Sequence, residues 1–316
     1  MGKGKAQSKA PQRTLGQRIV RDKWLLLIFL PAILNVLIFK YGPMFGLVIA
    51  FKDYRPLVGF AKSPWVGWAN FQRMFDIPEF GKILWNSITL NIESLVFTFP
   101  VPIIFAILLN EMRGRKFKRV TQTIVYLPHF IAVVIVAGMV KEFLSPSSGF
   151  IAHMIARIGR MSTVPMLLTN PSASHAIIIL TSLWQNFGWG TIIYLASLSS
   201  VDPQLYEAAT IDGASRFQRV IHITLPALAP VISIELIMAV GGLMSTSFDL
   251  PFLLQNGENM DTMEVLSTYV YKQGIASYAP DYGYTTAVGL FDSVINFILL
   301  IFANSASRKI SETSFF

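Results

Sequence analysis

The chain has 316 residues, of which 53% are hydrophobic and only 14% charged, and its mean hydropathy is +0.52. Soluble domains carry about 25% charged residues, so this composition excludes an ordinary soluble enzyme and indicates an integral membrane protein. The formal net charge is +8, but the basic residues cluster at the edges of apolar runs, which argues against a nucleic-acid partner. The chain has no cysteine, which excludes disulfides, thiolate metal sites and cysteine nucleophiles.

Six stretches are long and apolar enough to cross a membrane, which takes roughly 20 mostly apolar residues. They predict an all-α integral membrane protein with transmembrane helices at 24–46, 85–109, 120–140, 176–198, 228–248 and 284–303. A basic arm, residues 1–23, precedes the first span, which is long enough to be a retained helix and not a cleaved signal peptide. Pro100 and Pro102 in span two and Pro128 in span three predict kinks.

Lysine and arginine near the span ends predict the orientation. Seven lie in the first 23 residues and five in residues 111–120, between spans two and three. The link between spans four and five and the tail, 306–316, are also basic. With six spans all four segments fall on one side, so both termini are expected in the cytoplasm. On the outer side, SPWVGWANFQRMF (63–75) is compatible with an interfacial helix with aromatic anchors or with an ordinary ordered loop.

The longest cytoplasmic link between spans is polar and carries both charge signs. It includes YEAATIDGASRFQRVIHITLPALAP, residues 206–230. Asp202 and Pro203 suit the cap and first turn of a helix, which we expect to end or bend at Gly213. SRFQRVIHI is expected to form a second helix, which Pro226 and Pro230 stop before span five. The result is a helix–glycine–helix elbow, for which a solvated loop on lipid headgroups is the alternative on physical grounds alone.

The elbow is narrow on one side because small residues follow one another there. These are Ala208, Ala209, Gly213 and Ala214. Another protein could therefore approach the backbone closely. The spacing Glu207-Ala208-Ala209, then Gly213, Ile223 and Leu225-Pro226, resembles the EAA motif of membrane subunits of binding-protein-dependent ABC importers at every fixed position.

This resemblance implies a type I ABC importer permease fold, in which the elbow is a coupling helix that docks on a separate cytoplasmic ATPase. The residues that it assigns to coupling are Glu207, Ala208, Ala209, Asp212, Gly213, Ile223, Leu225 and Pro226, within a coupling loop at 203–226. The implied permease domain is 24–305. The implied partners are a second homologous permease, two ABC ATPases and an extracytoplasmic solute-binding protein, all at the bacterial cytoplasmic (inner) membrane.

Further segments are similar to carbohydrate permeases of the LplB-like branch. They are EAATIDGAS and ITLPALAP, together with YGPMFGLVIAFKDY, MEVLSTYVYKQGI and DYGYTTAVGLFDSVINF. That branch is associated with oligosaccharides from complex, often acidic polysaccharides, for example alginate or uronate oligosaccharides. No G-x-x-x-x-G-K-[ST] sequence is present, so ATP and Mg²⁺ are expected on a partner ATPase and no cofactor on this chain.

Charged residues at membrane depth are candidates for function, because each costs on the order of 2.5–3.5 kcal/mol on insertion scales. Glu93 lies in span two, Glu235 in span five, and Asp292 in span six with Asn296 one turn later. Hydrogen bonds between helices of the bundle are the alternative for each. Leu243 and Thr246, in span five, match sugar-contacting positions of maltose-type permeases by their offset from the EAA motif.

Span four contains SLWQNFGWGTIIY, in which aromatic and amide side chains surround Gly188 and Gly190. Sugars bind to aromatic faces and to hydrogen-bonding amides, although an aromatic packing belt is the alternative. The predicted substrate pathway consists of Trp184, Asn186, Trp189, Gly190, Tyr194, Glu235, Leu243, Thr246 and Asp292, with Asn186 and Trp189 as first choices. Gln185 belongs to the same stretch.

The four histidines, His129, His153, His175 and His222, show no metal-ligand spacing and no carboxylate nearby in sequence. We therefore predict no metal site and no catalysis. Three alternatives remain to the sugar importer. They are the same architecture with a non-sugar cargo, a secondary transporter or channel that uses the membrane carboxylates, and a polytopic enzyme.

Overall fold

The computed structural model describes residues 21–112 and 114–311, and most of this part of the chain is helical. Most of the predicted basic arm and the last five residues lie outside it. The one β-bridge among the described residues joins Lys52 and Trp65. Five helices are long and apolar enough to cross a membrane, and a bent pair makes a sixth if it counts as one span. These are Lys23–Phe51, Pro78–Glu111, the pair Arg115–Phe130 and Val133–Phe143, Pro171–Ser199, Arg216–Gly241 and Tyr282–Arg308.

The chain divides into two units, Met1–Ile49 and Ala50–Phe316. The first unit contains α2 (Lys23–Val36), η1 (Leu37–Tyr41), α3 (Gly42–Met44) and most of η2 (Phe45–Phe51). These segments form one continuous apolar helix, and the Arg21–Asp22 ion pair (2.8 Å) precedes it. An uninterrupted apolar run of this length is typical of a membrane span.

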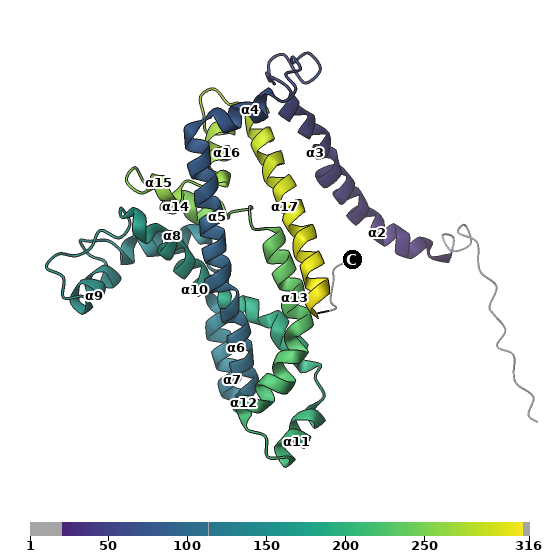
Figure 1. Ribbon diagram of the computed structural model, residues 1–316, viewed down its shortest axis with the longest axis vertical. Helices are drawn as coiled ribbons and strands as arrows, with labels where there is room; N and C mark the ends of the chain where they lie inside the picture. Colours follow the sequence, from purple (N-terminus) through teal and green to yellow (C-terminus); the bar gives the residue numbers. More distant parts are fainter. Residues whose placement is uncertain (1–20, 113, 312–316) are drawn as a thin grey trace, which may run out of the picture. The chain divides into compact units, whose positions relative to one another are not determined.

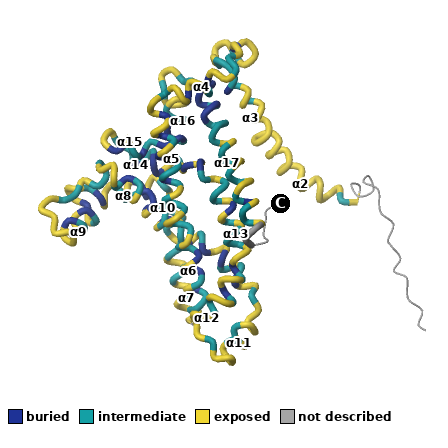
Figure 2. The backbone as a smooth tube through the Cα atoms, viewed as in Figure 1, coloured by how far each residue is buried: buried dark blue, intermediate teal, exposed yellow. Residues whose placement is uncertain are grey.

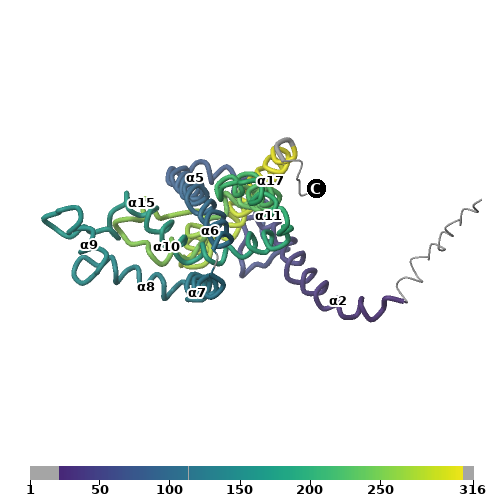
Figure 3. Tube along the Cα trace, turned by 90° about the horizontal axis from the view of Figure 1, so that it is seen from below, coloured from purple at the N-terminus to yellow at the C-terminus, as the bar shows by residue number. Residues whose placement is uncertain are grey.

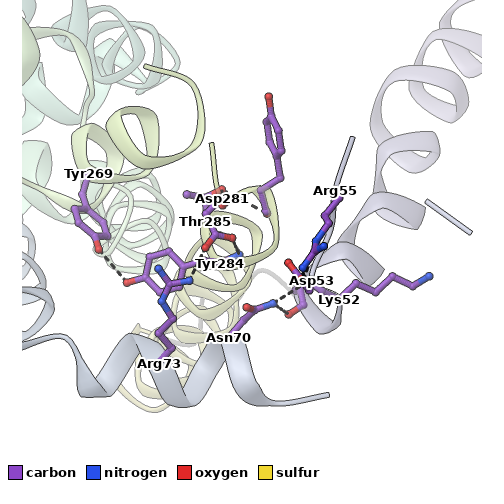
Figure 4. Close-up of polar contacts among 11 residues, drawn as sticks. Lys52, Asp53, Arg55, Asn70, Arg73, Tyr269, Asp281, Tyr284 and Thr285 are labelled. Atoms are coloured by element: carbon purple, nitrogen blue, oxygen red, sulfur yellow. Dashed lines mark hydrogen bonds and ion pairs between the residues drawn. The ribbon is translucent and has the colours of Figure 1, made fainter. Parts of the chain in front are cut away.

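The second unit begins with α4 (Ala69–Asp76), so only the later half of the predicted 63–75 segment is helical. Polar contacts join α4 to the segment that precedes it and to the start of α17 (Tyr282–Ser311) (Figure 4). Asn70 donates to the carbonyls of Ala50 (2.8 Å) and Lys52 (3.1 Å). Arg73 pairs with Asp281 and lies over the ring of Tyr284, 4.9 Å from its centroid. α4 is therefore a fixed part of the unit.

α5 (Pro78–Thr98) and α6 (Pro100–Glu111) together form the second span, which starts earlier than predicted. The third span is broken. α7 (Arg115–Tyr126) and the 3₁₀ turn η3 (Leu127–Phe130) meet α8 (Val133–Phe143) at 96°, beside Pro128 as predicted. α8 and α9 (Phe150–Ile158) extend to one side of the bundle, away from α17 (Figures 1 and 3).

α10 (Pro171–Ser199) is the central helix of the second unit and contacts α5, α6, α7, α13 and α15. α11 (Pro203–Ile211) follows it. α12 (Arg216–Arg219), the π-turn η4 (Val220–Thr224) and α13 (Leu225–Gly241) then form one continuous helix. The prediction that Pro226 and Pro230 separate the elbow from span five was wrong. The wide π-turn η4 ends at Thr224, two positions before Pro226, and it accommodates a residue without an N–H, so the helix continues.

Span five ends at Gly241 and does not reach residue 248 as predicted. The irregular segment 242–248 leads into three short helices, α14 (Asp249–Leu254), α15 (Met260–Met263) and α16 (Leu266–Gly274), before α17 (Tyr282–Ser311). Side chains of other spans bond this segment, one through a backbone N–H that the helix no longer uses and one through a side-chain hydroxyl. Asn296 accepts from the N–H of Met244 (2.8 Å), and Asn91 donates to Thr246 Oγ1 (2.8 Å).

Three buried apolar clusters hold the second unit together. One joins α4, α5, α16 and α17 around Phe80 and Tyr284. The second joins α5, α8, α10 and α14 around Leu254. The third joins α6, α10 and α13 around Ala106 and Leu228, next to the end of α13 that continues into the elbow. In Figure 2 buried residues lie inside the bundle, whereas α11 at its lower tip is exposed.

Candidate functional site

The elbow begins with a capped helix. Asp202 accepts a hydrogen bond from the N–H of Gln204 (2.9 Å), and Pro203 occupies the first turn of α11, as predicted. Figure 1 places α11 at the end of the unit, beyond α6 and α7. Glu207 and Ala208 on this helix are exposed, and Ala209 is half-buried.

Gly213 ends α11 with a backbone φ of +78°, in the left-handed region that glycine adopts without steric cost. Its N–H donates to the carbonyl of Thr210 (3.2 Å). The N–H of Ala214 donates to the carbonyl of Ala209 (2.9 Å), which completes a Schellman motif. A Cβ at Gly213 would find no other atom within 4 Å, so the backbone is open to a partner.

The second arm of the elbow begins with a capping box. Ser215 Oγ accepts from the N–H of Gln218 (3.3 Å), and Gln218 Oε1 accepts from the N–H of Ser215 (2.8 Å). The predicted helix–glycine–helix elbow is therefore confirmed. Apolar side chains project from it, since Ile211 is 86% exposed and Phe217 72% exposed. Exposed apolar groups beside open backbone are typical of a docking surface.

The remaining predicted coupling residues lie in two places. Asp212 is exposed and follows α11 directly as its C-terminal cap. Ile223 is half-buried in η4, and Leu225 and Pro226 are exposed at the start of α13. The motif therefore combines an exposed elbow with the first turns of span five.

Asn186 and Trp189 of α10 meet a histidine from the broken third span. His129 Nδ1 donates to Asn186 Oδ1 (3.0 Å), and its ring stacks on Trp189 with 4.5 Å between centroids and 8° between planes. Phe130 contacts the same indole edge-on at 5.7 Å. Trp189 remains 45% exposed. Sequence reasoning missed His129, because it lies 57 positions from Asn186 and only the bend at η3 brings the two together.

A second group of predicted residues lines a small cavity of about 250 Å³. Gly190, Tyr194 and Glu235 belong to it, together with Pro102 of α6. Tyr194 is otherwise buried in the cluster that joins α6, α10 and α13. A Cβ at Gly190 would lie 3.2 Å from Pro102 Cγ, so this glycine allows close packing of α10 on α6.

Glu93 is paired with a histidine that the sequence did not connect to it. His175 Nδ1 donates to Glu93 Oε2 (2.8 Å), and His175 Nε2 lies 3.3 Å from the carbonyl oxygen of Thr262. These three residues line a cavity of about 700 Å³ between α5 and α10. Trp184 is not part of either polar group and lines an apolar cavity of about 520 Å³ with residues of α8 and α9.

Asp292, Leu243 and Thr246 lie at the irregular segment after α13. Asn296 Nδ2 donates to Ser245 Oγ (2.9 Å) and lies 3.3 Å from Asp292 Oδ2. Asp292 Oδ1 is buried and has no hydrogen-bond partner among the described residues. Thr246 is buried and Leu243 half-buried. The three membrane carboxylates thus occupy three separate surroundings, each with its own polar neighbours.

No group of three or more histidine and acidic side chains that could hold a metal occurs in the part of the chain that the structure describes. The site consists instead of an exposed elbow between two spans and of polar or aromatic groups on the spanning helices. Such an arrangement suits conduction of a polar solute under the control of a partner protein.

The family model for the binding-protein-dependent transport system inner membrane component matches residues 98–312. The chain belongs to this family. It is 41% identical to Protein LplB of Bacillus subtilis (strain 168), over 97% of both chains. It is 40% identical to the polygalacturonan/rhamnogalacturonan transport system permease protein YteP of the same organism, over 96% of this chain and 94% of the relative.

Solved structures agree with this membership. A bacterial ABC transporter involved in the import of the acidic polysaccharide alginate contains a chain with a TM-score of 0.85 and 39% identity, over 94% of this chain and 99% of the other. A structure of a bacterial alginate ABC transporter in complex with its alginate pentasaccharide-bound periplasmic protein also contains a similar chain. The TM-score is 0.85 and the sequence identity 38%, over 96% of this chain and 100% of the other. The predicted ABC importer permease fold is confirmed, and the chain is a multi-pass permease subunit of a sugar ABC importer.

Proposed function

We propose that this permease imports an acidic oligosaccharide released from a polysaccharide, with transport driven by separate ATPase subunits that dock on the elbow. The cargo class rests on the relatives, since one is a polygalacturonan/rhamnogalacturonan transport system permease and another belongs to an importer of the acidic polysaccharide alginate. A non-sugar cargo and a secondary transporter are not favoured, because neither accounts for these similarities and the elbow together.

The observation that supports sugar handling is the group formed by His129, Asn186 and Trp189. A half-exposed indole offers a flat apolar face to a sugar ring, and the amide and imidazole offer hydrogen bonds to its hydroxyls. We also assign Glu235 of α13 to the pathway, since it lines one cavity with Gly190 and Tyr194 of α10. Trp184, Leu243, Thr246 and Asp292 complete the proposed substrate pathway.

The elbow couples this chain to ATP hydrolysis. An ATPase groove can reach the open backbone at Gly213, while Ile211 provides an apolar anchor and Glu207 a charged one. ATP and Mg²⁺ would be bound by the partner ATPase pair. Because α12, η4 and α13 form one helix, displacement of the elbow would tilt span five directly.

The complete importer would contain a second homologous permease, two ATPases and an extracytoplasmic solute-binding protein in the bacterial cytoplasmic membrane. The binding-protein partner is supported by the alginate importer, whose structure includes its periplasmic protein. Positive charge in the link after α6 supports a cytoplasmic position for that end and for both termini.

The test is ATP hydrolysis by the importer in liposomes, stimulated by its binding protein and a panel of alginate, galacturonate and neutral malto-oligosaccharides. We expect stimulation by an acidic sugar, and we expect Gly213→Asp to abolish it while the subunits still assemble. Gly213→Asn is the matched control, because asparagine has the same shape and tolerates positive φ but carries no charge. Wild-type stimulation in Gly213→Asp would exclude the elbow as the coupling surface, and stimulation by the neutral sugar alone would exclude an acidic cargo.

A further inference from the structure

Arg219 is the last residue of α12, and its guanidinium contacts two other segments, α11 and α6. Its Nη1 donates to Thr210 Oγ1 of α11 (2.7 Å), and its Nη2 lies 4.0 Å from Glu111 Oε2 at the end of α6. Thr210 Oγ1 in turn donates to the carbonyl of Tyr206 (2.7 Å). The side chains of Arg219 and Glu111 are only 17% and 23% exposed. One side chain therefore joins α12, α11 and α6.

A cavity and two polar contacts lie at this junction between the elbow and the spans. A cavity of about 430 Å³ opens between α6, the end of α10 and the elbow, and it is lined by Glu111, Tyr206, Arg216 and Arg219 among others. Next to it, Tyr206 OH bonds Thr224 Oγ1 (3.1 Å), which fixes α11 to η4. The third apolar cluster already packs α6 on α13 around Ala106 and Leu228, so the contacts of Arg219 add a polar link between α11, α12 and the end of α6.

Backbone continuity gives the two neighbouring spans different relationships to the elbow. α13 continues the second arm of the elbow, so it follows any displacement of that arm. α6 ends at Glu111 and reaches the elbow only through side-chain contacts. A planar guanidinium can serve a hydroxyl and a carboxylate at the same time, which a lysine ammonium does less well. A half-buried ion pair is weak evidence for stability, which favours a role in fixing geometry.

We propose that Arg219 is a positioning residue that fixes the coupling elbow to α6 through Glu111, so that displacement of the elbow moves α6 and α13 together. The proposal deepens the proposed function, since it rests on the elbow being the coupling surface. It assigns Arg219 a role that the EAA motif does not include, because the motif has no fixed residue between Gly213 and Ile223.

The absence of cysteine makes a direct distance measurement possible. Cysteines at Leu205 on α11 and Leu108 on α6, both exposed, would carry spin labels in the purified importer without nucleotide. Wild type should give a narrow distance distribution, and Arg219→Ala a broad one. Arg216→Ala is the matched control, because Arg216 lines the same cavity on the same helix without an ion pair to Glu111 in the structure. An unchanged distribution in Arg219→Ala overturns the proposal.

A second experiment measures function as the amount of alginate or galacturonate oligosaccharide transported per ATP hydrolysed. We expect Arg219→Ala and Glu111→Ala each to lower this ratio by about 2- to 30-fold, the range found for residues along such a connection. The exchange Glu111→Arg with Arg219→Glu should restore most of it. Failure of the exchange to recover any of the loss would show that the pair does not act as proposed. If Arg219→Ala does not assemble, Glu111→Gln carries the same test with an unchanged side-chain shape.

The two proposals fail in different ways. Loss of ATPase docking in Gly213→Asp leaves the label distance narrow, because the contact between Arg219 and Glu111 does not need the partner. A broad distance in Arg219→Ala together with an unchanged transport ratio would overturn the coupling role of Arg219 and leave the docking surface intact.

Discussion

His175 and Glu93 lie 82 positions apart in sequence, yet His175 Nδ1 donates to Glu93 Oε2 at 2.8 Å. The other ring nitrogen faces the carbonyl oxygen of Thr262, so both nitrogens meet acceptors. The pair joins α5 to α10, and the contact with Thr262 extends it to α15. These contacts therefore join α15 to α5 and α10 at the wall of the cavity of about 700 Å³.

Removing both members of this pair should destabilise the protein by less than the sum of the two single losses. His175→Ala leaves Glu93 half-buried without its donor, for which we expect a loss of about 1–3 kcal/mol in the free energy of unfolding. Glu93→Ala should behave similarly, and the double variant should lose less than the sum. Thermal unfolding of the purified importer in detergent measures all three, and strictly additive losses would contradict a direct interaction.

Trp189→Ala should raise the KM for transported sugar by about 10-fold, because an aromatic face contributes on the order of 1 kcal/mol beyond its buried area. ATP hydrolysis without binding protein should stay unchanged. Trp189→Phe should retain most of the affinity. Trp184→Ala is the control, since Trp184 lies in the apolar cavity beside α8 and α9. An equal effect of the two alanine variants would argue for general packing and against a sugar contact.

Gly188→Ala should destabilise the bundle, because the new Cβ would lie 2.2 Å from the carbonyl oxygen of Val125, which is backbone and cannot move aside. Overpacking of this kind costs about 1–3 kcal/mol. Gly289→Ala, also inside a spanning helix, meets no atom within 4 Å and should be neutral or slightly stabilising. The measurement is the unfolding temperature of each variant, which we expect to be lower for Gly188→Ala than for Gly289→Ala. Equal values would contradict the close approach of α10 to α7.

Asn296→Ala should loosen the irregular segment after α13, because it leaves the N–H of Met244 without its acceptor. We expect about 1–3 kcal/mol of lost stability and faster proteolysis or hydrogen exchange at 242–248. Ser293→Ala on the same helix is the control, since its exposed hydroxyl bonds only the carbonyl of Gly289 among the described residues. Equal exchange rates in the two variants would show that Asn296 does not hold this segment.

Sequence by itself determined the features that depend on neighbouring residues. Each span is a local run of apolar side chains, which crosses a bilayer whatever else the chain does. The elbow is equally local, because Asp202 caps one helix, Gly213 supplies the left-handed residue that ends it, and Ser215 starts the next. The match to the importer family followed from the same residues.

Tertiary structure decided where the spans break and which polar groups meet. The sequence pattern predicts helix through residue 248, but Asn296 bonds the backbone N–H of Met244 and Asn91 bonds the hydroxyl of Thr246, and these contacts from other spans stabilise the break. Pro226 does not interrupt the helix, which runs from Arg216 to Gly241 with the π-turn η4 before the proline. The contacts of His129 with Asn186, His175 with Glu93, and Arg219 with Glu111 join residues far apart in the chain. Local patterns carry no information about them, because the packing of α5, α6 and α10 alone sets those distances.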